Sequence, residues 1–150
     1  MSPQNKLLAL FRERADDVER ILGAELKGLT SEIGDYAHFH TARGFGVTFQ
    51  QAHGQPCCVR LAAKLAEASK CRQDGIIRHE LGHVVDLSFP GDVLDRWALS
   101  RGVKLPPKSQ GEIRADAIAE AIWLQTLRYD DATVQNVCEG VMRRPAHLGL

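Results

Sequence analysis

His79-Glu80-Leu81-Gly82-His83 has the pattern H-E-x-x-H, and the sequence around it indicates that it lies on a helix. A helix places positions i and i+4 on one face, so the imidazoles of His79 and His83 can reach the same metal ion. The carboxylate of Glu80 then lies beside that ion, where it can take a proton from a bound water. The pattern therefore predicts a zinc site, whereas the alternative is a pair of surface histidines that bind nothing.

The residues on either side of this motif predict a helix over 75–88. Asp74 can cap its N-terminus, and Pro90 lies just beyond its C-terminus. Its apolar residues form a stripe away from the two histidines, which consists of Ile77, Leu81, Val84 and Val85. Gly82 costs about 1 kcal/mol relative to alanine inside a helix, so its presence predicts a close neighbour at this position.

A catalytic zinc site needs a third protein ligand, and a second helix predicted over 110–128 offers carboxylates for this role. The segment is apolar on almost every side, so the helix should be buried. Glu112 and Asp116 lie one turn apart on it, and buried carboxylates favour a metal or an ionic partner. We expect Glu112 to be the ligand, with Asp116 or Glu120 as alternatives. If Glu112 binds no metal, we expect it to form a capping box with Ser109 at the start of this helix.

The two motifs together resemble those of the gluzincin clan of zinc metallopeptidases. In that clan H-E-x-x-H is followed by E-x-x-A-D on a downstream helix. Here 28 residues separate His83 from the matching stretch Glu112-Ile113-Arg114-Ala115-Asp116. The short chain and the strand-rich stretch before the first motif are most similar to the minigluzincins and to the small intracellular ImmA/IrrE-like peptidases. No H-x-x-G-x-x-H extension follows His83, which disfavours the metzincins.

The resemblance covers roughly residues 45–128 and implies a zincin-like α+β fold, with a small antiparallel sheet beside the motif helix. It implies that His79, His83 and Glu112 bind one zinc ion per chain. It also implies that Glu80 is the general base and that Asp116 orients a ligand imidazole, that of His79. The expected activity is hydrolysis of peptide bonds in a peptide or protein substrate.

Two alternatives to an active peptidase stay open. One is an inactive relative in which the zincin-like domain is a scaffold or binds a partner. The other is a regulatory protein with a structural metal, which would use a closed, four-ligand site. The presence of Glu80 favours the enzyme, because a purely structural site has no need of a base. Tyr129 and His147 are candidates for a second donor to the oxyanion, and we assign that role to neither.

The region before the motif helix, about 33–62, predicts three short strands in an antiparallel sheet. They are expected at Tyr36–His40, Gly44–Gln50 and Pro56–Ala62. In gluzincin-like folds an edge strand near the active helix pairs with extended substrate, and we expect Cys57–Leu61 to be that edge. His38 and His40 share one face of the first strand, but no residue with a recognisable spacing offers a third ligand for a second metal.

The rest of the chain predicts further helices within a single domain that spans 1–150. An amphipathic helix over 4–27, ended by Gly28, should pack its apolar face on the core. A short helix over Asp92–Arg101 and a last helix over 131–144 complete the expected elements.

Composition argues against two classes of function. The net charge is zero and no basic stripe is present, so we expect no nucleic-acid binding. No segment has the length of a membrane span and the first residues lack a signal-peptide pattern, so we expect no membrane association and a cytoplasmic location. The four cysteines form no C-x-x-C pattern, so neither a zinc knuckle nor a disulfide framework is indicated.

Overall fold

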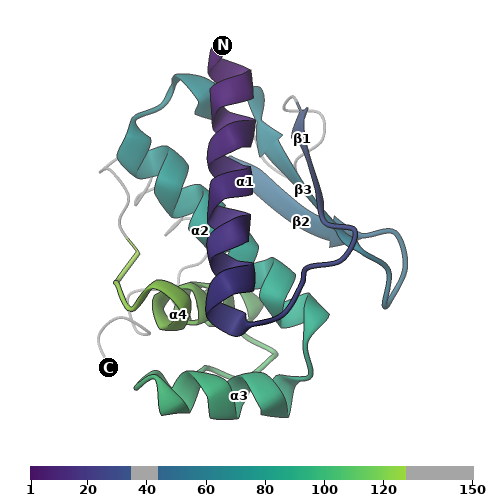
Figure 1. Cartoon of the computed structure of the whole chain (residues 1–150), viewed down its shortest axis with the longest axis vertical. Helices are drawn as coiled ribbons and strands as arrows, with labels where there is room; N and C mark the ends of the chain where they lie inside the picture. Colours follow the sequence, from purple (N-terminus) through teal and green to yellow (C-terminus); the bar gives the residue numbers. More distant parts are fainter. Residues whose placement is uncertain (35–43, 128–150) are drawn as a thin grey trace.

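The computed structural model describes residues 1–34 and 44–127, and these form an α+β arrangement of helices beside a small sheet (Figure 1). In chain order the elements are α1 (Pro3–Leu22), β1 (Thr30–Gly34), β2 (Gly46–Gln50), β3 (Cys57–Ala62), the 3₁₀ helix η2 (Ala63–Glu67), α2 (Lys70–Ser88), α3 (Gly91–Ser100) and α4 (Gly111–Trp123). The coarse prediction of an α+β fold is confirmed. Within the described residues, no helix is both long and apolar enough to cross a membrane.

The sheet is mixed, so the prediction of an antiparallel sheet is wrong. Its strand order is β1-β3-β2, with β1 parallel and β2 antiparallel to β3. The predicted edge Cys57–Leu61 is therefore the central strand. Its alternating burial does not reveal this, because any strand with one buried face alternates in the same way. The parallel strand Thr30–Gly34 was not predicted, and the predicted strand Tyr36–His40 lies outside the described residues.

Helix α2 is the element on which the others pack. It contacts α1, the sheet and α4, and Figure 1 shows α1 passing in front of it with the sheet on the right. The predicted apolar stripe of α2 is fully buried. The helix begins at Lys70 rather than at residue 75, because Ser69 caps it by accepting a hydrogen bond from the Arg72 amide at 3.1 Å. The prediction of Asp74 as the cap is wrong.

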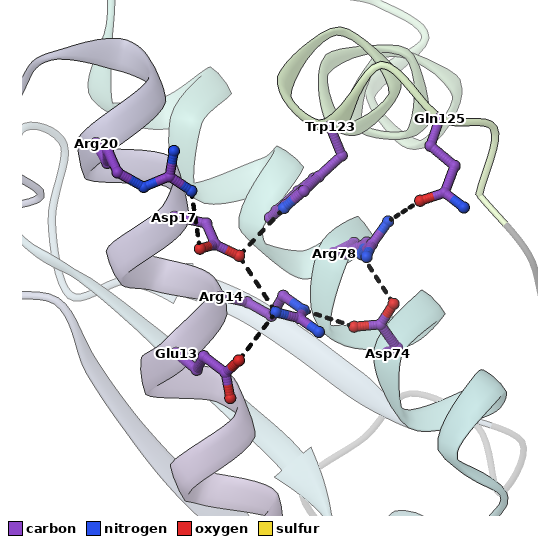
Figure 2. A network of polar contacts seen from close by, with 8 residues as sticks. All are labelled: Glu13, Arg14, Asp17, Arg20, Asp74, Arg78, Trp123 and Gln125. Carbon is purple, nitrogen blue, oxygen red and sulfur yellow. Dashed lines mark hydrogen bonds and ion pairs between the residues drawn. The ribbon is translucent and has the colours of Figure 1, made fainter.

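Asp74 instead belongs to a polar network that joins three helices (Figure 2). Its carboxylate forms ion pairs with Arg14 of α1 at 2.7 Å and with Arg78 of α2 at 2.9 Å. Asp17 of α1 contacts Arg14 at 3.2 Å and accepts a hydrogen bond from the indole of Trp123 in α4 at 3.4 Å. The network fixes α1 and the end of α4 against the first half of α2.

The other helices differ from prediction mainly at their ends. Helix α1 ends at Leu22 rather than at residue 27, because Gly23 adopts a left-handed conformation (φ 68°) and its amide bonds to the Glu19 carbonyl. Helix α3 is confirmed within one residue at each end. Helix α4 ends at Trp123 rather than at residue 128. The last helix predicted over 131–144 lies outside the described residues.

Candidate metal centre

Helices α2 and α4 meet at Gly82. A Cβ atom at this position would overlap the backbone carbonyl of Ala115 in α4, so no side chain fits between the two helices. The close neighbour predicted from this glycine is confirmed. The contact lies within the motif itself, one residue before His83, and it brings α4 to the histidine face of α2.

The carboxylate of Glu112 lies between the two histidines. Its Oε2 atom is 2.7 Å from Nε2 of His79, and its Oε1 atom is 3.2 Å from Nε2 of His83. The two imidazole rings stand edge to face, with centroids 4.8 Å apart. One ligand atom from each of the three residues lies within 4.8 Å of the others, so the group could hold a metal ion. The three predicted ligands are therefore brought together.

Asp116 lies on the opposite side of the His79 ring from Glu112. Its side chain is completely buried, and its Oδ1 atom is 2.6 Å from Nδ1 of His79. An imidazole held in this way donates its Nδ1–H to the carboxylate and presents Nε2 to a metal. The contact is the one expected for a residue that orients a ligand imidazole, and His79 is the histidine that was predicted.

The polar contacts of the three residues fit a metal site. Both ring nitrogens of His79 lie within hydrogen-bond distance of carboxylate oxygens. Burial by itself raises the pKa of Glu112, but the hydrogen bonds and positive charge of His79 and His83 lower it far below its usual value. A metal ion bound by the two Nε2 atoms and this carboxylate would occupy the place of a shared proton.

The alternative roles for nearby carboxylates are not supported. The prediction that Ser109 and Glu112 form a capping box is wrong, because Gln110 is the N-cap of α4 and makes no side-chain capping hydrogen bond. Glu120 does not join the histidines. Its carboxylate instead bonds to the backbone of Leu127, and burial raises its pKa.

Glu80 lies next to the ligands on α2 and is only 5% exposed. Strand β2 covers it. The hydroxyl of Thr48 is 2.8 Å from the Glu80 Oε1 atom. Gly46 leaves room for the Glu80 side chain, because a Cβ atom at position 46 would lie only 3.1 Å from Cγ of Glu80. Sequence reasoning missed these two residues, since no spacing within a short strand reveals which distant side chain it covers.

Arg114 is a second residue that sequence reasoning missed. It lies between Glu112 and Asp116 in the sequence, and its side chain is almost completely buried. Its Nε atom is 2.9 Å from Oδ1 of Asp86 near the end of α2, and its Nη1 atom is 2.9 Å from Oδ1 of Asp95 in α3. A positive residue within an otherwise apolar helix is the signal that could have predicted this buried ion pair.

Comparisons with protein-family models, with curated protein sequences and with solved structures gave no match. Of the predicted residues outside the metal centre, Tyr129 and His147 lie beyond the described part of the chain, and so do His38 and His40.

Proposed function

We propose that this protein is a zinc-dependent peptidase of the gluzincin type, with a zincin-like fold similar to that of the minigluzincins. The observation that supports this most strongly is the Glu112 carboxylate, which reaches the Nε2 atoms of both His79 and His83. Two imidazoles and one carboxylate are a common ligand set of catalytic zinc. Among the described residues the group has three members, which favours an open site over a closed, four-ligand structural one.

The chemistry follows from the roles of these side chains. Zinc bound by His79, His83 and Glu112 would make a bound water more acidic and would polarise the carbonyl of a peptide bond. Glu80 accepts the proton of the attacking water and then passes it to the leaving amine as the C–N bond breaks. The products are a carboxylate and an amine. Asp116 keeps the Nδ1 proton of His79 in place, so Nε2 stays directed at the metal.

Strand β2 is the best candidate for the peptide-binding edge. Within the described residues it pairs with β3 on one side only, and it lies against α2 next to Glu80. An extended peptide that added to this edge would be held by main-chain hydrogen bonds, with little dependence on its sequence. β2 therefore replaces Cys57–Leu61 in the role predicted from the sequence.

The experiment that tests this function compares the wild type with Glu80→Gln after loading with zinc. Cleavage of fluorescently labelled casein and of a mixed peptide library would be followed by fluorescence and mass spectrometry, and zinc by elemental analysis. We expect hydrolysis by the wild type, and zinc binding without hydrolysis by the variant. Equal hydrolysis by both proteins would contradict the mechanism. Zinc binding without any hydrolysis by the wild type would favour the inactive scaffold.

A further inference from the structure

We infer that Thr48 is a positioning residue for Glu80, and that β2 thereby holds the general base as well as the substrate edge. This inference rests on the proposed function. It concerns a residue outside both sequence motifs, and it starts from the surroundings of the Glu80 carboxylate.

The contact between Thr48 and Glu80 is short and partly buried. The Thr48 hydroxyl is 2.8 Å from the Glu80 Oε1 atom and 3.1 Å from the Glu80 carbonyl oxygen, and it has one proton to donate. The carboxylate is the nearer acceptor and the charged one, so it receives the stronger bond. With Glu80 only 5% exposed, little water can replace this donor.

Gly46 leaves room for the same carboxylate at a second point on the strand. Positions 46 and 48 share one face of β2, because side chains alternate along a strand. A Cβ atom at position 46 would lie 3.1 Å from Cγ of Glu80 and 3.4 Å from its Oε2 atom. The carboxylate therefore lies directly beneath the strand, with Oε1 bonded to Thr48 and Oε2 next to the glycine.

The consequence is a division of roles between two elements. Helix α2 supplies Glu80, and β2 determines where its carboxylate points. Without the Thr48 hydroxyl, the side chain of Glu80 can rotate away from the geometry needed to accept a proton. The chemical step should then slow, while binding of a peptide by the β2 backbone should change little.

The variants that test this are Thr48→Val, which keeps the shape but removes the donor, and Thr48→Ser, which keeps the donor. Thr30→Val is a matched control, because it makes the same chemical change on the opposite edge strand. We expect Thr48→Val to lower kcat on the casein substrate about tenfold or more with KM nearly unchanged. Thr48→Ser and Thr30→Val should stay within about threefold of the wild type.

A second measurement does not depend on turnover. Acetohydroxamic acid gives up its hydroxyl proton when it binds a metal, and a carboxylate beside the metal can hold that proton, whereas azide brings no proton. In cobalt-loaded protein, visible absorption would report both affinities. Thr48→Val should weaken the binding of acetohydroxamic acid about tenfold without weakening the binding of azide. Glu80→Gln should have the same selective effect.

These outcomes separate the inference from the proposed function. If Thr48→Val matches the wild type in kcat and in acetohydroxamic acid binding while Glu80→Gln is impaired, the inference is wrong and the peptidase stands. If Thr48→Val weakens the binding of acetohydroxamic acid and of azide equally, Thr48 supports the site as a whole and the inference is also wrong. A wild type that takes up neither zinc nor cobalt would overturn both.

Discussion

At Gly82 the backbones of α2 and α4 approach more closely than any side chain would permit. The position directly precedes His83, and its neighbour Ala115 directly precedes Asp116. The glycine that is unfavourable for the helix by itself therefore sets the distance between the histidines and the carboxylates. Its conformational cost is offset by the contact that it allows.

The substitution Gly82→Ala should destabilise the protein by about 1–3 kcal/mol, because the new methyl group meets backbone atoms that cannot rotate away. It should also weaken zinc binding, since α4 carries Glu112 away from the histidines. Urea unfolding and a chelator competition would measure the two effects. Gly111→Ala is the control, because a Cβ there meets nothing within 4 Å. Equal stability of the two variants would contradict the close packing.

Glu112 gives the metal-free protein a predictable response to acid. Its pKa is lower in the folded than in the unfolded chain, so its charge stabilises the fold above the unfolded value of about 4.3. That contribution is lost as the pH falls from there toward the folded pKa. In chelator, the difference in unfolding free energy between the wild type and Glu112→Gln should therefore shrink below about pH 5. A difference that grows as the pH falls below about 5 would contradict this assignment.

At the scale of the elements, the sequence predicted which segments are helical better than where they begin or how the strands pair. Ser69 and Asp74 are both good N-cap residues. Asp74 is instead held by a tertiary ion pair with Arg14 and by an i,i+4 pair with Arg78 of the same helix. Strand order could not be predicted, because it depends on contacts between residues 28 positions apart, such as Thr30 and Cys58. Helix α2 was predictable because the spacing of its two histidines requires a helix, and α4 because its sequence is apolar on almost every side.

Helix α4 depends on a buried ion pair for its place against α2. Asp86→Ala should lower the free energy of unfolding by about 3 kcal/mol, because it leaves the buried guanidinium of Arg114 without its partner in α2. Chemical denaturation would measure the loss. The control Asp92→Ala removes an exposed pair with Arg96 and should cost no more than about 0.5 kcal/mol. Similar losses in the two variants would show that Arg114 does not anchor α4.

At the scale of the whole molecule, α2 lies between the sheet and α4, so one helix presents its residues to both. His79 and His83 face the carboxylates of α4, whereas Glu80 faces β2. The sequence predicted the ligand side of this arrangement because two motifs describe it. It could not predict the β2 side, since Thr48 belongs to no motif and reaches Glu80 only through the fold.

The zinc content of the purified protein shows whether His79, His83 and Glu112 bind a metal ion. After loading and dialysis, elemental analysis should find about one zinc per chain in the wild type and little in Glu112→Ala. Asp116→Ala should bind zinc 10–100-fold more weakly. Glu120→Ala removes a carboxylate from the same helix outside the metal group, so it should keep about one zinc. A wild type that holds no zinc after reconstitution, or a Glu112→Ala variant that holds as much as the wild type, would contradict the account.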